Sequence, residues 1–255
     1  MGTLSSVSIE PRGDPGTQLR IGTAGWAIPR DVRDAFPATG STLERYAARF
    51  GAAEVNSSFH RPHRPDTWAR WAASVPPDFR FAVKLPKAIT HEARLVDCAS
   101  LLAAFAEQIA GLGERRGPIL VQLPPSLAFD AEVARAFLTD LRVTLGPNAT
   151  MEPRHASWFE TEADALLAEH RVARVAADPA RIAAAAEPGG WRGLTYYRLH
   201  GSPDVYRSRY GEARLAEWAA RISKATETWM IFDNTASGAA TSDALLMTKM
   251  LATRA

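Results

Sequence analysis

The feature that most constrains this chain is the regular alternation of short apolar segments with longer segments of helical spacing. Each short segment is rich in apolar, β-branched or aromatic residues and ends in polar residues, glycine or proline. The candidate strands are 19–24, 52–56, 79–85, 118–123, 149–153, 172–177, 195–200 and 228–233. This alternation is typical of βα units around a parallel sheet. Several segments are apolar on both faces, as a sheet covered by helices requires.

The segments between these strands carry helix signals. Ser41 and Glu44 have the spacing of a capping box, and Asp66 and Asp130 are placed to cap two further helices. An apolar stripe with a glycine stop is predicted from Leu101, Phe105, Ile109, Leu112 and Gly113. Helices are also expected near 161–170, 212–223 and 241–252. The Ala-rich segment 178–191 gives no clear signal, and its form stays open.

A chain of this pattern can form either a closed (β/α)8 barrel or an open doubly wound sheet. An open sheet usually has a glycine-rich phosphate turn after its first strand. The turn at 22–26, Gly-Thr-Ala-Gly-Trp, matches neither the dinucleotide fingerprint nor a P-loop. The length of 255 residues suits one barrel, which takes about 250. We therefore expect an α/β fold with a single TIM barrel over 19–255, preceded by a disordered tail over 1–18.

Composition narrows the classes of protein to consider. Thirty basic and 28 acidic residues give a net charge of +2, so any basic surface must be local. The single cysteine, Cys98, cannot form an internal disulfide, which fits a reducing compartment. No apolar run is long enough to span a bilayer, and the N-terminal segment lacks the pattern of a secretory signal. We expect a cytoplasmic protein with no membrane association.

Polar residues fall at the carboxyl ends of the candidate strands, where barrels place their active sites. They are Glu54, Asn56, Lys84, Gln122, Glu152, Arg154, His155, Asp178, Arg198, His200, Asp233 and Asn234, with His91 on the loop after the third strand. Residues two apart on a strand share a face, so Glu152 and Arg154 point the same way, as do Arg198 and His200. Polar groups inside an apolar barrel are costly unless they bond one another or a ligand. We therefore expect them to converge at one mouth.

Several of these residues have a structural interpretation beside the functional one. Glu54 is equally suited to be a buried ion-pair partner of Lys84 or of an arginine. Gln122 could satisfy backbone groups, and Asp178 is better explained as a helix N-cap than as a catalytic group. Tryptophans 68 and 71 have helical spacing and are expected in the core, whereas Trp26 and Trp158 follow strands and are candidates to line a pocket.

Seven segments together resemble the DUF72 family, also called the YecE-like family. They are IGTAGW (21–26), EVNSSFHRP (54–62), FRFAVKLPKAITHEARL (79–95), GPILVQLPPS (117–126), MEPRHASWF (151–159), YYRLHG (196–201) and FDNTASGAA (232–240). The resemblance implies a TIM-barrel-like fold but no established activity. Two departures are visible: His60 stands where the family commonly has Tyr, and Pro153 stands between Glu152 and Arg154. Because proline lacks an N–H, the fifth strand is expected to end at Glu152.

The predicted mouth has the chemistry of an anion site. Positive charge from Lys84, Arg154 and Arg198, with helix N-termini facing the same end, favours an anionic, phosphate-bearing ligand. The loops after the seventh and eighth strands are where barrels often bind phosphate, although they could equally be flexible turns. The predicted catalytic residues are Glu152, His200, Asp233 and Lys84. The predicted substrate-binding residues are Asn56, Gln122, Arg154, Arg198, Asn234, Trp26 and Tyr206.

Two functions remain open at this point. The first is an enzyme using acid–base or hydrolytic chemistry, with Glu152 and His200 transferring protons and Asp233 orienting His200. The second is a module that binds nucleic acid or a phosphorylated metabolite without a reaction. Binding would involve Lys84, Arg154 and Arg198, with an exposed loop at Tyr206, Arg207, Arg209 and Tyr210. The favoured alternative for this loop is a lid over the barrel mouth. No organic cofactor motif is present. A divalent metal is not favoured, because His91 and His155 lack a metal-site spacing.

Overall fold

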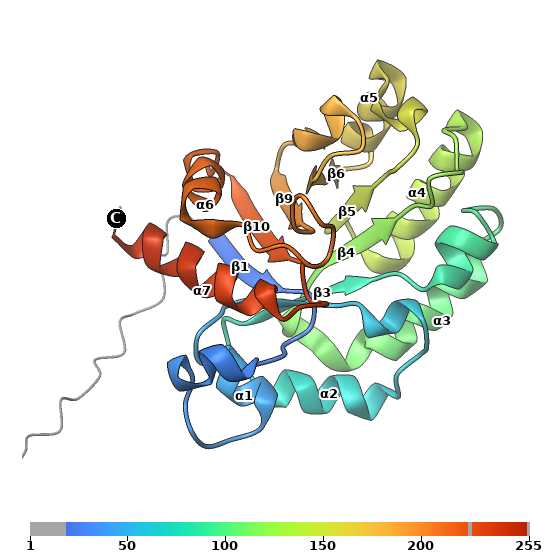
Figure 1. The fold of residues 1–255 in the computed structure, drawn as a ribbon. Coiled ribbons are helices and arrows are strands. Elements are labelled where there is room, and N and C mark those ends of the chain that lie inside the picture. Colours follow the sequence, from blue (N-terminus) through green and yellow to red (C-terminus); the bar gives the residue numbers. More distant parts are fainter. Residues whose placement is uncertain (1–18, 224–225, 254–255) are drawn as a thin grey trace, which may run out of the picture.

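The computed structural model describes residues 19–223 and 226–253, and it shows an α/β protein with two largely parallel sheets (Figure 1). The first sheet has the order β1–β10–β9–β7, and the second has the order β2–β3–β4–β5–β6–β8. The strands are β1 Leu19–Thr23, β2 Ala52–Val55, β3 Arg80–Lys84, β4 Arg116–Gln122, β5 Ala149–Glu152, β6 Val172–Arg174, β7 Ala176–Asp178, β8 Gly189–Gly190, β9 Leu194–Leu199 and β10 Glu227–Phe232. The one antiparallel pair among them joins β6 to the two-residue β8.

Helices pack around the outside of the strands (Figure 1). They are α1 Thr42–Ala47, α2 Pro65–Ala73, α3 Ala99–Ile109, α4 Ala131–Leu145, α5 Thr161–Glu169, α6 Gly211–Ala220 and α7 Ala239–Ala252. Each predicted strand segment is present with its ends within two residues of the prediction, and β5 does end at Glu152, before Pro153. The Ala-rich segment forms a short 3-10 turn, Ala183–Ala186, followed by β8.

The two sheets are linked by the chain itself. The predicted strand 172–177 is split at Val175, so that β6 pairs with β5 in one sheet and β7 pairs with β9 in the other. On the opposite side, Ala24 forms an isolated parallel bridge with Glu54, and Gly25 N donates to Glu54 O at 2.8 Å. The sheets therefore approach each other at both ends of the strand order.

Two apolar clusters stabilise this arrangement. The larger one lies between the strands and the surrounding helices. The smaller one joins side chains of both sheets, including Ala52, Leu120, Tyr196 and Trp229, with the rings of Tyr196 and Trp229 stacked at 5.9 Å. The period of two along a strand places Glu54 on the same face as Ala52. The inner apolar cluster thus continues directly into the polar residues at the strand ends.

The helix signals were correct in part. The capping box of Ser41 and Glu44 is present, and Asp130 caps α4. Asp66 is not a cap, because α2 begins one residue earlier with Pro65 at its first position. Leu101 was wrongly placed in the buried stripe: it is 38% exposed, and the buried face of α3 carries Leu102, Phe105 and Ile109 instead. The helix ends at Ile109, and Leu112 and Gly113 lie in the 3-10 turn that follows.

The predicted disordered tail, 1–18, lies outside the described residues. Over the ranges that the structure does describe, no helix has the length and apolar character needed to cross a membrane.

Candidate functional site

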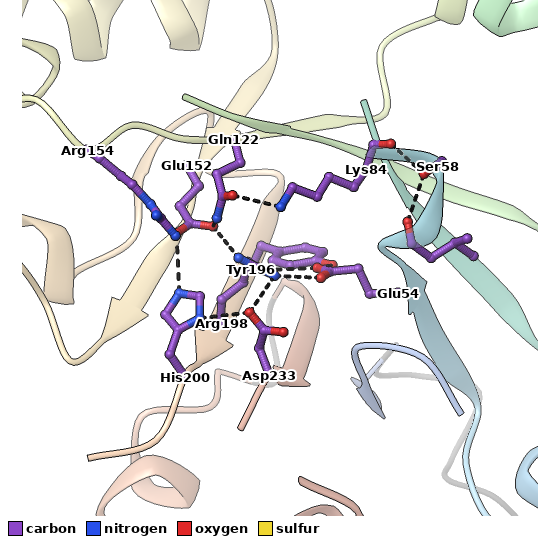
Figure 2. A network of polar contacts seen from close by, with 11 residues as sticks. Glu54, Ser58, Lys84, Gln122, Glu152, Arg154, Tyr196, Arg198, His200 and Asp233 are labelled. Carbon is purple, nitrogen blue, oxygen red and sulfur yellow. Dashed lines mark hydrogen bonds and ion pairs between the residues drawn. The ribbon is translucent and has the colours of Figure 1, made fainter. Parts of the chain in front are cut away.

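Arg198, near the end of β9, is the centre of a buried ionic network (Figure 2). Its side chain is fully buried and contacts three carboxylates. Nη2 and Nε donate to Glu54 at 2.7 and 3.1 Å, Nη1 donates to Glu152 at 2.5 Å, and Nη2 also donates to Asp233 at 2.9 Å. The interpretation of Glu54 as an ion-pair partner of an arginine is therefore confirmed. Bidentate pairing of this kind fixes both partners in orientation.

His200 lies between two of these carboxylates. Its Nδ1 is 2.9 Å from Asp233 Oδ2, and its Nε2 is 3.3 Å from Glu152 Oε1. Burial lowers the pKa of His200, but the charge of Glu152 and the hydrogen bonds to both carboxylates outweigh burial, so the pKa is raised above its ordinary value. A protonated ring can donate to both carboxylates at once. The site therefore favours an imidazolium.

The pKa values of the two carboxylates that contact His200 are shifted in the opposite direction, downward. Burial alone would raise the pKa of Glu152, yet the positive charges of Arg198 and His200 hold it well below the usual range. The pKa of Asp233 is also lowered, since Arg198 and the hydrogen bond from His200 outweigh burial. Both groups are ionised at neutral pH. They are acceptors for the His200 protons.

A second branch of the network runs to Lys84 at the end of β3. Lys84 Nζ donates to Gln122 Oε1 at 2.7 Å, and Gln122 Nε2 donates to Glu152 Oε2 at 2.9 Å (Figure 2). The ammonium also lies 4.1 Å from the centroid of the Phe59 ring. Burial and the charge of Arg198 lower the pKa of Lys84 to about 8, against the opposing effect of the carboxylates. Gln122 thus bonds to the side chains of Lys84 and Glu152 and not, as in the structural alternative for this residue, to backbone groups.

A cavity of about 290 Å³ opens beside His200 and Glu152. Arg154 and Tyr206 line it together with these two residues. Arg154 reaches Glu152 Oε1 only at 3.3 and 3.4 Å, which is long for a charge-assisted bond of about 2.7–2.9 Å. Tyr206 packs edge-on against His200, with ring centroids 5.6 Å apart. The charged floor of the cavity therefore consists of Glu152, His200 and Arg154, whose guanidinium makes long hydrogen bonds to Glu152 and also contacts Tyr206.

The structure brings most of the predicted site residues together, but not all. Asn234 is buried away from the cavity: its Nδ2 donates to Ser208 O and to Asp243 Oδ2, at 2.9 and 2.7 Å. The turn after β10 likewise bonds to the 201–210 loop, through Ala236 N to Tyr206 O. Asn56 is half-buried with no hydrogen-bond partner on its Oδ1, and it does not line the cavity.

The two tryptophans predicted to line a pocket, Trp26 and Trp158, do not line this cavity. Trp26 packs edge-on against Trp71 and Phe81, at 5.0 and 6.1 Å, and is not part of the cavity wall. Trp158 is buried and donates to Leu127 O at 3.0 Å. It lines a different cavity, of about 240 Å³, beside α4. Trp68 is fully buried, as expected of a core residue.

Two interpretations from the sequence are wrong. Asp178 is not a helix N-cap: it ends β7, and its Oδ1 accepts from Arg214 at 3.0 Å. Tyr210 is not exposed, because its ring is buried and its hydroxyl donates to Asp178 O and accepts from Gly201 N. Arg209 is exposed but paired with Asp31 at 2.7 Å. The predicted surface of alternating basic and aromatic residues is therefore reduced to Tyr206 and Arg207.

The two histidines considered as metal ligands make local contacts. His91 Nδ1 lies 2.8 Å from Thr90 Oγ1, and its ring packs against Phe59. His155 Nδ1 accepts from Ser157 N and caps the turn after β5. Among the described residues, no three His, Cys, Asp or Glu side chains form a group that could hold a metal ion.

Sequence reasoning missed several residues of the site. Tyr196 donates to Glu54 Oε2 at 2.8 Å, but its position within an apolar strand indicated only a core residue. The apolar part of the cavity wall includes Phe159, Ile182 and Val205. These follow strands, yet apolar loop residues carry no signal that separates them from ordinary packing.

Comparisons with known proteins agree with this architecture. A family model described as "Protein of unknown function DUF72" matches residues 20–255. The UPF0759 protein YecE of Escherichia coli K12 is 33% identical over 106 residues, which are 42% of this chain and only 38% of that protein.

Solved structures of two DUF72 family proteins are similar over most of the chain. The one from Enterococcus faecalis V583 has a TM-score of 0.75 and 22% identity, covering 92% of this chain and 95% of the other. The one from Thermotoga maritima MSB8 has a TM-score of 0.74 and 24% identity, covering 92% and 99%. At such identity the likeness concerns the fold alone.

Proposed function

The chain belongs to the DUF72 family, whose description names no activity, and we propose that it is an enzyme that transfers protons to or from a small anionic, phosphate-bearing substrate. The observation that carries this proposal is the position of His200. It is held between Glu152 and Asp233 and at the same time lines the cavity. A histidine with a raised pKa beside a substrate-sized space is suited to act as a general acid.

The other residues have roles that follow from their contacts. Asp233 fixes the orientation of the His200 ring through Nδ1, which leaves Nε2 directed toward Glu152 and the cavity. The Nε2 contact to Glu152 is long, at 3.3 Å, so a substrate oxygen can take its place. His200 would take up a proton again from water once the product has left, and the ionised Glu152 would stabilise the imidazolium that this restores. Lys84 and Gln122 position Glu152 from the other side.

Arg154 is the residue that would bind the anion. Its side chain is 20% exposed, whereas Arg198 is fully buried and already neutralised by three carboxylates. A guanidinium presents planar paired donors, which match phosphate and carboxylate groups. Arg198 is therefore a positioning residue in this proposal, and Arg154 takes over the substrate-binding role that the sequence divided between them.

We also propose that the two sheets form one closed (β/α)8 barrel. The bridge between Ala24 and Glu54 supports closure on one side, and the passage of the chain from β6 to β7 supports it on the other. In a closed barrel the cavity lies at the carboxyl ends of the strands, where barrel enzymes have their active sites.

The test is a substitution of His200 in a substrate screen. The purified protein is incubated with a panel of phosphate monoesters and sugar phosphates, and products are followed by phosphate release and by ³¹P and ¹H NMR. With any substrate found, His200→Gln should lower kcat by about 10²–10⁴-fold, the usual contribution of a general acid. His170→Gln, a change of the same kind at the end of α5, should leave kcat unchanged.

Two results would contradict the proposal. Equal turnover by wild type and His200→Gln would remove His200 from the chemistry. Saturable binding of panel members or of a single-stranded oligonucleotide, with no product from any of them, would favour a binding module. Circular dichroism of each variant distinguishes lost chemistry from lost folding.

A further inference from the structure

The cavity beside His200 is divided between a charged floor and an apolar wall. Glu152, Arg154 and His200 form the floor, and Phe159, Ile182 and Val205 are part of the wall. The volume of about 290 Å³ is at the lower end of the range of about 300–1,000 Å³ that ligand pockets occupy. The space is therefore suited to one small molecule, and most of that molecule would touch carbon.

The apolar wall is not explained by packing of the fold. Val205 is 44% exposed and Tyr206 is 39% exposed, although both are large apolar or aromatic side chains. They are neighbours on one loop, and both face the cavity. An isolated exposed apolar residue needs no explanation, but two adjacent ones that line a concave site indicate an apolar ligand surface.

The wall is also held in place. The ring of Phe159 lies 4.7 Å from the guanidinium of Arg174, which is itself bonded to Asp164 at 2.9 Å. Tyr206 N donates to His200 O, and Tyr206 O accepts from Ala236 N. One side of the cavity is thus anchored to β6 through Arg174, and the other is anchored to His200 at the end of β9. A ligand would meet preformed surfaces of opposite character.

We propose that the substrate of this site is an amphipathic anion: one anionic group placed on Arg154 within reach of His200, joined to an uncharged apolar body that packs against Phe159, Ile182 and Val205. This inference rests on the proposed function for the anionic group and extends it to the rest of the molecule. Free inorganic anions and highly hydroxylated sugar phosphates would leave the apolar wall in contact with water.

The test compares ligands that share a head group. Binding of methylphosphonate and phenylphosphonate, and of acetate and phenylacetate, is measured by isothermal titration calorimetry on the full chain at pH 7. Each phenyl ligand should bind at least about tenfold more tightly than its partner, since a single methylene in an apolar pocket is already worth about 10–200-fold. The two pairs also distinguish a phosphoryl head group from a carboxylate.

Substitutions in the apolar wall then test whether the phenyl group binds there. Val205→Asp places a carboxylate at the apolar wall on an exposed loop, and it should abolish the preference for the phenyl ligands. Ile182→Ala should reduce the preference as well. It is the second variant, in case Val205→Asp perturbs the loop that carries it. Val143→Asp is the matched control, because Val143 lies on α4 and is 82% exposed, and it should change nothing.

The outcomes separate this inference from the proposed function. Equal affinity within both pairs, with binding lost in Arg154→Gln, would overturn the amphipathic ligand and leave the anion site intact. A phenyl preference that persists in both wall variants would also overturn the inference, because the apolar body would then bind elsewhere. No binding of any of the four ligands at millimolar concentration would count against both.

Discussion

Arg198 is the residue on which the whole site depends. Three buried carboxylates surround one guanidinium that cannot be deprotonated, and each carboxylate relies on it for compensation. Desolvation alone would make such charges costly, so the pairing is a requirement of the fold as well as of any chemistry. Lysine could not replace it, since an ammonium presents a point charge instead of a planar fork.

We predict that Arg198→Met lowers the free energy of unfolding by about 3–5 kcal/mol, the usual cost of removing one partner of a buried ion pair. The reason is that Glu54, Glu152 and Asp233 would then repel one another in a dry environment. Urea unfolding followed by circular dichroism measures the change. Arg135→Met is the control: its pair with Glu169 is more than half exposed and should contribute at most about 1 kcal/mol.

His200 gives the protein a pH-dependent stability of defined sign. Its pKa is raised in the folded state, so the folded protein binds the proton more tightly than the unfolded chain. The stabilisation is fully present below the unfolded pKa of about 6.5 and is lost as pH rises through the higher folded pKa. The stability difference between wild type and His200→Gln should therefore shrink over that window. A difference that grows with pH, in urea titrations from pH 6 to 9, would contradict the raised pKa.

The position of polar residues at strand ends identified most of this network from the sequence, because side chains two residues apart on a strand point to the same face. Glu152, Arg198 and Asp233 lie at or next to strand ends, and Arg198 and Asp233 share a face with Tyr196 and Ile231 of the inner cluster. Their convergence therefore follows from the sheet. The same rule also selected Asn234, which instead holds the 201–210 loop to α7. Strand ends supply both site residues and loop anchors, and residue type alone does not separate them.

At the scale of the element, helix starts show where local signals succeed. Asp130 Oδ1 accepts from both Glu132 N and Val133 N at 3.0 Å, which satisfies two donors that a helix leaves free. Asp66 was an equally good candidate by residue type. The proline before it takes the first helical position and moves the cap to Arg64. The position of the proline therefore predicts the start of α2 better than the presence of an aspartate does.

We predict that Asp130→Ala lowers the free energy of unfolding by about 0.5–2 kcal/mol through loss of the cap. Asp66→Ala should cost less, about 0.3–1 kcal/mol, since it removes only a favourable charge from the first turn of α2. Both variants are measured by urea unfolding under the same conditions. An equal or larger effect at Asp66 would mean that its side chain takes part in the capping of α2.

The strand predicted over 172–177 has a property that the sequence pattern of a single element does not predict. Its apolar run correctly indicated a strand, but the run is divided at Val175 between two sheets. The division depends on where the neighbouring strands β5 and β9 lie, which is a property of tertiary packing. The short β8 is another example, because its two glycines pair with β6 and carry no strand propensity of their own.

For the whole molecule, the sequence indicated eight strand segments and their covering by helices, but not how the two sheets meet. The apolar character of both strand faces, which predicted a sheet covered by helices, fits the two apolar clusters of the structure. The approach of β1 to β2 is decided by a steric detail. A Cβ on Gly22 would lie 2.2 Å from Ala52 O, so the two strands can be this close only because position 22 is glycine.

We predict that Gly22→Ala lowers the free energy of unfolding by about 1–3 kcal/mol, the usual cost of forcing an extra methyl group into a packed interior. The clash is with backbone, so β1 and β2 must separate, which would weaken the contact between the sheets and the hydrogen bond from Gly25 N to Glu54 O. Gly51→Ala is the control, since a Cβ there meets nothing within 4 Å. It should leave stability unchanged or raise it by up to about 1 kcal/mol. If Gly22→Ala unfolds at the same urea concentration as wild type, the sheets do not need this close approach, and closure of the barrel is not supported on that side.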